Sequence, residues 1–243
     1  MRHTYDQLRE HLFAKDRATF PKKAFTLKEW TWAFTMYDSR VIQLHRGNNQ
    51  EGNTPTFIPL IDMVNCRESQ DKTFIKFNDR TQTADMRADV DFAAGEQVFE
   101  TYGNKSNYEY LLYNGFVMDL NPNECVYIEL PKPKNLPKAS DFKFCLDPNS
   151  PSIPPHLKRW GSMTWKDESI GKGQASDVVI KLLDSKMQRY ATTADQDEKL
   201  LQELKRKGGE HSNVGLALRL RLLEKRALEK ARRKLVDEEW ACC

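Results

Sequence analysis

Two polar segments of the sequence carry side chains whose types and spacing could perform chemistry. The first is D-M-V-N at 62–65, which follows an apolar F-I-P-L, and the second is Y-G-N-K-S-N at 102–107. Arg40 adds a guanidinium, whose fork of donors fits a carboxylate. Each residue alone has an ordinary interpretation: Asp62 could cap a turn, Arg40 could be a solvated helix arginine, and Tyr102 could end a strand. Only the combination points to a site.

Acid–base and metal chemistry have weaker support. Three acids could suggest an acid–base pair, namely Glu96, Glu100 and Asp119. We expect them instead to form a solvated edge. The five histidines are scattered without H-x3-H spacing, so we expect no metal site. The sequence has five cysteines: Cys66, Cys125, Cys145, Cys242 and Cys243. Their number is odd, and no two of them inside the fold have C-x-x-C spacing. This pattern predicts reduced, mostly buried thiols rather than a disulfide framework.

The helix that carries Arg40 has a clear start. Thr26-Leu-Lys-Glu29 is a capping box, in which the Thr hydroxyl serves an orphan amide and the Glu reaches back. Apolar residues recur at helical spacing beyond it, which predicts a helix to about His45. The short stretch 54–60 contains Pro59 and therefore predicts an edge strand or an extended approach to a site.

The elements around Tyr102 follow from alternation and turn residues. Residues 73–78 and 83–88 alternate on either side of N-D-R-T, which predicts a hairpin. A strand over 97–102 ends in a tight polar turn. Ser106 then caps a short helix that ends before Gly115. A further strand is predicted over 125–130.

The second half of the chain is predicted to be helical. A Pro- and Lys-rich stretch places a boundary near residue 131. Helices are predicted over 176–190, 195–207 and 213–240, and Gly208-Gly209 stops the second of them. The predicted helix over 213–240 is basic, but its leucines would form a buried face. A charged run on a helix is more often a solvated face than a nucleic-acid site, and no aromatic residues interleave with these charges.

Composition limits the class of protein. The chain has 243 residues, a formal net charge of +3 and 10% aromatic residues, which excludes a wholly disordered chain. The near-balanced charge demands no polyanionic partner. No apolar run approaches the roughly 18–20 residues that span a bilayer, and no signal-peptide core is present. We therefore expect a cytosolic or nuclear protein.

Together, F-I-P-L-I-D-M-V-N-C, G-E-Q-V-F-E-T-Y-G and S-N-Y-E-Y-L-L-Y-N-G-F resemble the C-terminal half of the SET domain of protein methyltransferases. The resemblance is to the group that contains plant Rubisco large-subunit lysine methyltransferase, fungal ribosomal-protein lysine methyltransferases and the animal actin-histidine methyltransferase. The helix W-A-F-T-M-Y-D-S-R also matches this group. Residues 193–230 look like the end of its helical substrate-binding domain.

The resemblance implies a role for each matching residue. Tyr102 falls on the family's catalytic tyrosine, and Arg40 on the arginine that meets the carboxylate of S-adenosylmethionine. The remaining cofactor-binding positions that it implies are Asp62, Met63, Val64, Asn65, Cys66, Asn114, Gly115 and Phe116. Cys66 stands where the family usually has histidine. Only 26 residues precede Leu27, without a G-x-G loop, so the resemblance implies an N-terminally incomplete SET domain.

We accordingly expect an α+β chain, with a partial SET domain over 1–130 and a Rubisco-LSMT-like substrate-binding domain over 131–243. By resemblance, it transfers a methyl group from S-adenosylmethionine to a side chain of a protein substrate. Lysine is preferred because Ile42, two residues after Arg40, offers an apolar wall to an alkylammonium stem. Histidine methylation is the alternative chemistry. A non-catalytic protein-binding module is the alternative function, and a nucleic-acid-binding module ranks below it.

Overall fold

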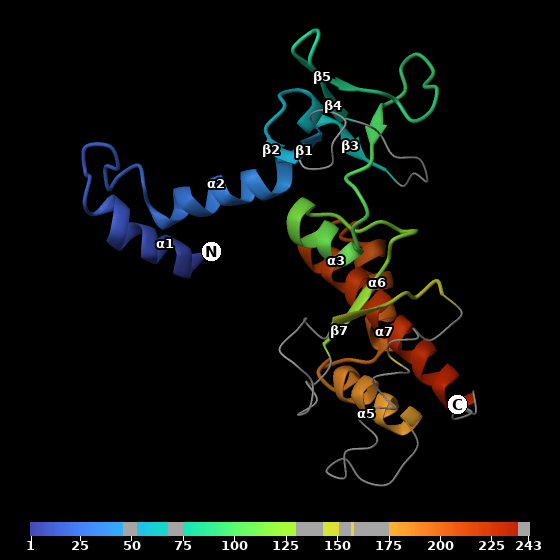
Figure 1. Ribbon diagram of the computed structural model, residues 1–243. Helices are drawn as coiled ribbons and strands as arrows, with labels where there is room; N and C mark the ends of the chain where they lie inside the picture. Colours follow the sequence, from blue (N-terminus) through green and yellow to red (C-terminus); the bar gives the residue numbers. More distant parts are fainter. Residues whose placement is uncertain (46–52, 68–74, 130–142, 151–156, 158–174, 238–243) are drawn as a thin grey trace. The chain divides into compact units, whose positions relative to one another are not determined.

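The computed structural model describes residues 1–45, 53–67, 75–129, 143–150, 157 and 175–237 (Figure 1). The chain divides into two compact units, Met1–Gly103 and Asn104–Cys243. The predicted α+β class is confirmed, since each unit holds both helices and strands. The predicted domain boundary near 131 lies outside the described residues and stays a prediction.

An aromatic cluster organises the helical start of the first unit. Helix α1 (Arg2–Leu8) continues as the π-helix η1 (Arg9–Phe13). Phe13 lies with its ring centroid 5.1 Å from Phe20 and 5.2 Å from Phe25. The Tyr5 hydroxyl donates to the Phe25 carbonyl at 3.0 Å. The chain is thereby fixed just before α2 (Leu27–Arg40), where the Thr26 hydroxyl accepts from an amide of the first turn as predicted.

Helix α2 ends at Arg40, five residues earlier than the apolar spacing predicts. Val41 is extended, and Ile42–His45 form β1, which pairs antiparallel with β2 (Asn53–Thr56). The β-branched pair Val41-Ile42 favours this extended conformation. The prediction of a helix to His45 is therefore wrong, because pairing with β2 overrides helical spacing.

The small sheet of the first unit has the strand order β2-β1-β4-β5. Strand β2 is at the edge, as Pro55 within it requires. Strands β4 (Ile75–Asn78) and β5 (Thr83–Met86) form the predicted hairpin, with Asn78 opposite Thr83.

Two short strands join distant segments of the first unit. Strand β3 (Asn65–Cys66) pairs in parallel with β6 (Phe99–Glu100), so that Asn65 lies opposite Phe99 and Cys66 opposite Glu100. The Arg67 amide extends the pairing by donating to the Glu100 carbonyl at 3.1 Å. This pairing joins the two polar segments that the sequence singles out.

The second unit begins with α3 (Asn107–Glu109) and the π-helix η3 (Tyr110–Asn114), followed by an antiparallel strand pair. Strand β7 (Val126–Glu129) was predicted, but its partner β8 (Lys143–Leu146) was not. Cys125, directly before β7, and Cys145, within β8, form a disulfide. The prediction that the cysteines are reduced is wrong for these two, because the unpredicted β8 brings Cys145 beside Cys125.

Strand β7 packs against helices to form the core of the second unit. Val126 and Ile128 are buried with residues of α5 (Ala175–Met187) and α7 (Asn213–Asp237). Helix α6 (Ala194–Arg206) packs along α7. It starts with a capping box at Thr193 and is followed by Gly208-Gly209, as predicted for its end. None of the helices in the described residues is long and apolar enough to cross a membrane.

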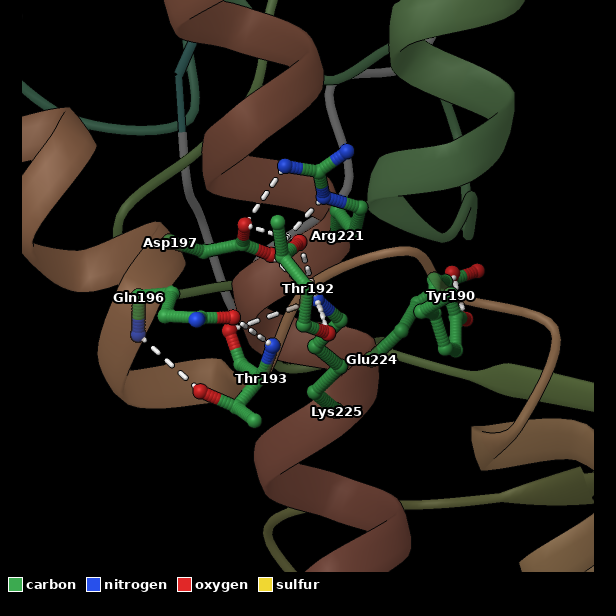
Figure 2. Close-up of polar contacts among 8 residues, drawn as sticks. All are labelled: Tyr190, Thr192, Thr193, Gln196, Asp197, Arg221, Glu224 and Lys225. Carbon is green, nitrogen blue, oxygen red and sulfur yellow. Dashed lines mark hydrogen bonds and ion pairs between the residues drawn. The ribbon is translucent and has the colours of Figure 1, made fainter.

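A buried ion-pair network ties α6 to α7 (Figure 2). The Asp197 carboxylate is fully buried and accepts from Arg221 Nε at 2.7 Å and from Lys225 Nζ at 2.5 Å. The Thr192 hydroxyl donates to the same carboxylate at 2.6 Å. Burial alone would raise the pKa of Asp197, but the hydrogen bonds from Arg221, Lys225 and Thr192 outweigh it and lower the pKa to about 2. Lys225 itself is only 3% exposed.

The basic residues of α7 differ in exposure: Lys225 is buried, whereas Arg226, Lys230 and Arg233 are exposed, as predicted for a solvated face. Arg219 binds Asp119 at 2.5 Å, and Arg226 binds Asp195 and Glu198. Partners within the chain thus occupy these cations.

Candidate active site

Arg40 reaches the D-M-V-N segment from the last turn of α2. Its Nη1 donates to the Asp62 carbonyl at 3.0 Å and lies 3.6 Å from the Asp62 carboxylate. The same nitrogen lies 3.3 Å from the Met63 sulfur. The Arg40 side chain keeps 35% of its surface exposed. Its remaining guanidinium nitrogens have no partner recorded among the described residues, so the fork can still receive a carboxylate.

A strained residue sets the position of Asp62. Leu60 has φ 73° and ψ −44°, a region that bulky L-residues rarely adopt, and it is 83% exposed. The 3-10 turn η2 (Ile61–Met63) follows it directly, with the Met63 amide donating to the Leu60 carbonyl at 3.2 Å. Such strain persists where the surrounding structure imposes it, often at functional sites.

Tyr102 contacts the same segment from just beyond β6, which ends at Glu100, two residues short of the predicted end of that strand. Its hydroxyl donates to the Val64 carbonyl at 2.8 Å, across 38 residues of sequence. Burial raises the pKa of Tyr102 to about 12, and the Glu100 charge adds to the effect. Tyr102 is therefore neutral at physiological pH. Its hydroxyl oxygen also has lone pairs that can accept a hydrogen bond.

Asn65 and Cys66 lie between these two contacts, in β3. Parallel pairing with β6 fixes their backbone. The Asn65 side chain is exposed, whereas Cys66 is half-buried and its thiol donates to the Arg67 carbonyl at 3.7 Å. In a strand, successive side chains alternate between faces. The two residues therefore cannot offer their side chains to the same ligand group, although both can offer backbone groups.

Glu100 is a site residue that the sequence reasoning misread. It was predicted to belong to a solvated edge, yet it is only 4% exposed. Burial raises the pKa of the Glu100 carboxyl to about 7, with a further contribution from the Asp62 charge. The available signal was its position two residues before Tyr102 in the predicted strand 97–102, which would place both side chains on one face.

Asn114, Gly115 and Phe116 belong to the second unit. Ser106 caps the start of their helix as predicted. The side-chain oxygen of Asn107 holds the loop that follows the helix by accepting from the Met118 backbone amide at 2.8 Å. Gly115 ends the helix at φ 80°, and Phe116 then stacks on Tyr110 at 4.9 Å between centroids. Their predicted role in cofactor binding stays a prediction.

The structure thus brings several of the predicted residues of the first unit together. Arg40, Asp62 and Met63 are in direct contact, and Tyr102 meets Val64. Asn65 and Cys66 follow in the paired strand. In the part of the chain that the structure describes, no group of three or more His, Cys, Asp or Glu side chains could hold a metal ion.

Comparison with known proteins places this arrangement in a known fold. The structure matches the crystal structure of the SET domain of LSMT bound to lysine and AdoHcy with a TM-score of 0.73, at 19% identity, covering 96% of this chain and 60% of that chain. The chain has the fold of a SET domain. A structure of Rubisco LSMT bound to AdoMet matches with a TM-score of 0.67 at 20% identity, covering 97% of this chain and 62% of that one. Residues 149–228 match the family model described as Rubisco LSMT substrate-binding. The predicted resemblance is confirmed at this level.

The sequence is also similar to curated methyltransferases. It is 26% identical to the actin-histidine N-methyltransferase of Xenopus tropicalis over 260 residues, which cover 89% of this chain and 43% of the relative. It is 34% identical to the protein of the same name from Canis lupus familiaris over 112 residues, which cover 45% of this chain and 18% of the relative. The chain therefore spans less than half the length of these relatives.

Proposed function

We propose that this SET-fold chain is a protein N-methyltransferase that uses S-adenosylmethionine. The observation that carries the proposal is the contact of the Tyr102 hydroxyl with the Val64 carbonyl, beside the contacts between Arg40 and Asp62. Through these contacts a neutral phenol lies beside D-M-V-N, the segment that we propose to bind the cofactor. The similarity to SET-domain structures and to curated protein methyltransferases supports the same activity.

The residues present fit S-adenosylmethionine on chemical grounds. The half-exposed Arg40 guanidinium suits the cofactor's carboxylate. The exposed Asn65 amide can donate and accept hydrogen bonds. Glu100 has a buried carboxylate oxygen without a hydrogen-bond partner among the described residues, which suits the neighbourhood of a cation. When bound, the cofactor supplies an electrophilic methyl group on a sulfonium.

The chain's own contribution to methyl transfer would be orientation and electrostatics. Arg40 and Asn65 would bind the cofactor. The Tyr102 oxygen would accept a hydrogen bond from the acceptor nitrogen and align its lone pair, which is the main requirement for an in-line displacement. We propose that the helical second unit contributes to binding a protein substrate, as its family match suggests.

We propose lysine as the acceptor, on the apolar wall that Ile42 offers to an alkyl stem. Ile42 lies half-buried at the start of β1, directly after the helix that carries Arg40. The printed names of the curated relatives favour histidine as the second candidate. Transfer of a tritiated methyl group to peptides that differ only in a central lysine or histidine would decide between them, and transfer to the histidine peptide alone would overturn the lysine proposal.

The first experiment is calorimetric titration of the chain with S-adenosylhomocysteine. We expect binding that Asn65→Ala abolishes, whereas Asn123→Ala, an exposed asparagine in the second unit, leaves it unchanged. In the transfer assay, Tyr102→Phe should lower the rate at least tenfold, whereas Tyr108→Phe should not. A folded chain that binds no cofactor would reject the enzyme and favour a non-catalytic protein-binding module.

A further inference from the structure

Glu100 is a buried acid that none of the contacts described above employs. Its carboxylate oxygen Oε2 is buried and has no hydrogen-bond partner among the described residues. Its backbone is held by the Cys66 pairing and by the Arg67 amide. A buried carboxylate without a partner carries a large desolvation cost, which natural sequences avoid unless another group compensates it.

Charge at the site is unbalanced when Glu100 ionises. Arg40 offsets Asp62, its neighbour at 3.6 Å. The nearby Arg67 is bound to Asp89 at 2.9 and 3.0 Å, so it is also offset. Among the described residues, the Glu100 carboxylate therefore adds one negative charge beside Tyr102 without an ion-pair partner. Its interaction with a cation would be strong, because the surroundings are shielded from water.

We propose that Glu100 makes the Tyr102 site prefer a positively charged ligand, so that the site distinguishes the sulfonium of S-adenosylmethionine from the neutral thioether of S-adenosylhomocysteine. The inference rests on the proposed function, because it assumes that the cofactor binds at this site. The two compounds share every other group. A preference for the sulfonium would favour release of the product after each transfer.

The preference should depend on pH through the ionisation of Glu100. Two groups interact with its charge: Asp62, which raises the Glu100 pKa, and Tyr102, whose own pKa the Glu100 charge raises. Cys66 and Arg67 adjoin Glu100 through the backbone pairing, and Arg40 acts on Asp62 and Tyr102. With the Glu100 pKa raised to about 7, the carboxyl is mostly protonated at pH 6 and mostly ionised at pH 8. A cation binds the ionised form better, so affinity for the sulfonium compound should rise with pH by up to about tenfold. The cofactor's own amino and carboxyl groups are common to both compounds and cancel in the ratio of their dissociation constants.

The test measures dissociation constants for both compounds by calorimetry at pH 6 and pH 8, with the full chain. For the wild type we expect the ratio of the thioether Kd to the sulfonium Kd to rise about tenfold between the two pH values. Glu100→Gln is nearly isosteric and should remove this rise. Glu96→Gln is the matched control, because Glu96 is an exposed acid just before the same strand.

A second measurement does not depend on a change in affinity. In a chain labelled with 13C at the glutamate carboxyls, one resonance should titrate near pH 7 and be missing from Glu100→Gln. Adding the sulfonium compound should shift its titration to lower pH, whereas the thioether should shift it little.

The outcomes separate this inference from the proposed function. If both compounds bind and Glu100→Gln keeps the wild-type ratio at both pH values, the inference is wrong and cofactor binding stands. If neither compound binds to the folded chain, both proposals are overturned. A resonance of Glu100 that titrates near pH 4.5 would also overturn the inference, because the carboxylate would then be stabilised without a cation.

Discussion

Replacing Asp197 by asparagine should destabilise the helical second unit by about 3 kcal/mol at pH 7. The asparagine would leave Lys225, which is 3% exposed, without its ionic partner, and breaking a buried pair in this way costs roughly 3–5 kcal/mol. We take the lower end because Arg221 is partly exposed and can turn to solvent.

The pKa of Asp197 gives an independent check on this magnitude. It is lowered from 3.8 to about 2 in the folded chain, which corresponds to about 2 kcal/mol of stability at neutral pH. Because the folded-state pKa is the lower one, this stability is present above about pH 4 and disappears as pH falls towards 2. The difference between wild type and Asp197→Asn should therefore shrink by about 2 kcal/mol between pH 7 and pH 2.

The assay is urea unfolding followed by circular dichroism at 222 nm, with hydrogen exchange of α6 and α7 peptides to localise the effect. Asp195→Asn is the matched control, because Asp195 lies on the same helix in an exposed pair with Arg226. Exposed pairs contribute at most about 1 kcal/mol. An Asp197→Asn variant no less stable than Asp195→Asn would refute the reasoning.

Three further substitutions test local backbone features. Leu60→Gly should stabilise the fold by about 1 kcal/mol and so raise its melting temperature. Leu60 is 83% exposed at φ 73°, and glycine adopts that conformation without strain. An unchanged or lower melting temperature would count against strain at this residue. Ser106→Ala should cost about 1 kcal/mol in urea unfolding through loss of the capping box, and Ser106→Thr should restore most of it. Gly215→Ala should destabilise α7, since an added Cβ would lie 2.6 Å from the Gly209 carbonyl oxygen, and faster hydrogen exchange in its first turn would show this. Normal exchange in that variant would mean that the turn adjusts freely.

Local signals in the sequence predicted much of the fold. Thr26 and Ser106 marked helix starts, and Gly115 and Gly208 marked helix ends, because caps and left-handed turns depend on a few adjacent residues. The hairpin of β4 and β5 followed from alternation alone. The motif residues Asp62 and Tyr102 were found by resemblance, and the structure places both in one unit.

The errors share a non-local cause. The residues of β1 have helical spacing, and only pairing with β2 makes them a strand. Cys145 joins Cys125 because β8 pairs with β7. Burial misled the reading of charge in the same way, since Lys225 is neutralised by a carboxylate from another helix and Glu100 is covered by segments distant in sequence. No local pattern encodes such partners.

The parallel pairing of β3 with β6 has a consequence for the order of folding. It joins residues 34 positions apart, and the Tyr102 contact with Val64 spans 38. Closing such loops costs chain entropy before any contact compensates it, so non-local pairs form slowly. The backbone hydrogen bonds within α6 and α7 instead join residues only four positions apart. We expect a refolding chain to recover its helical signal first and the Tyr102 site last. Newly made chains would then pass through a period in which they have helices but no site.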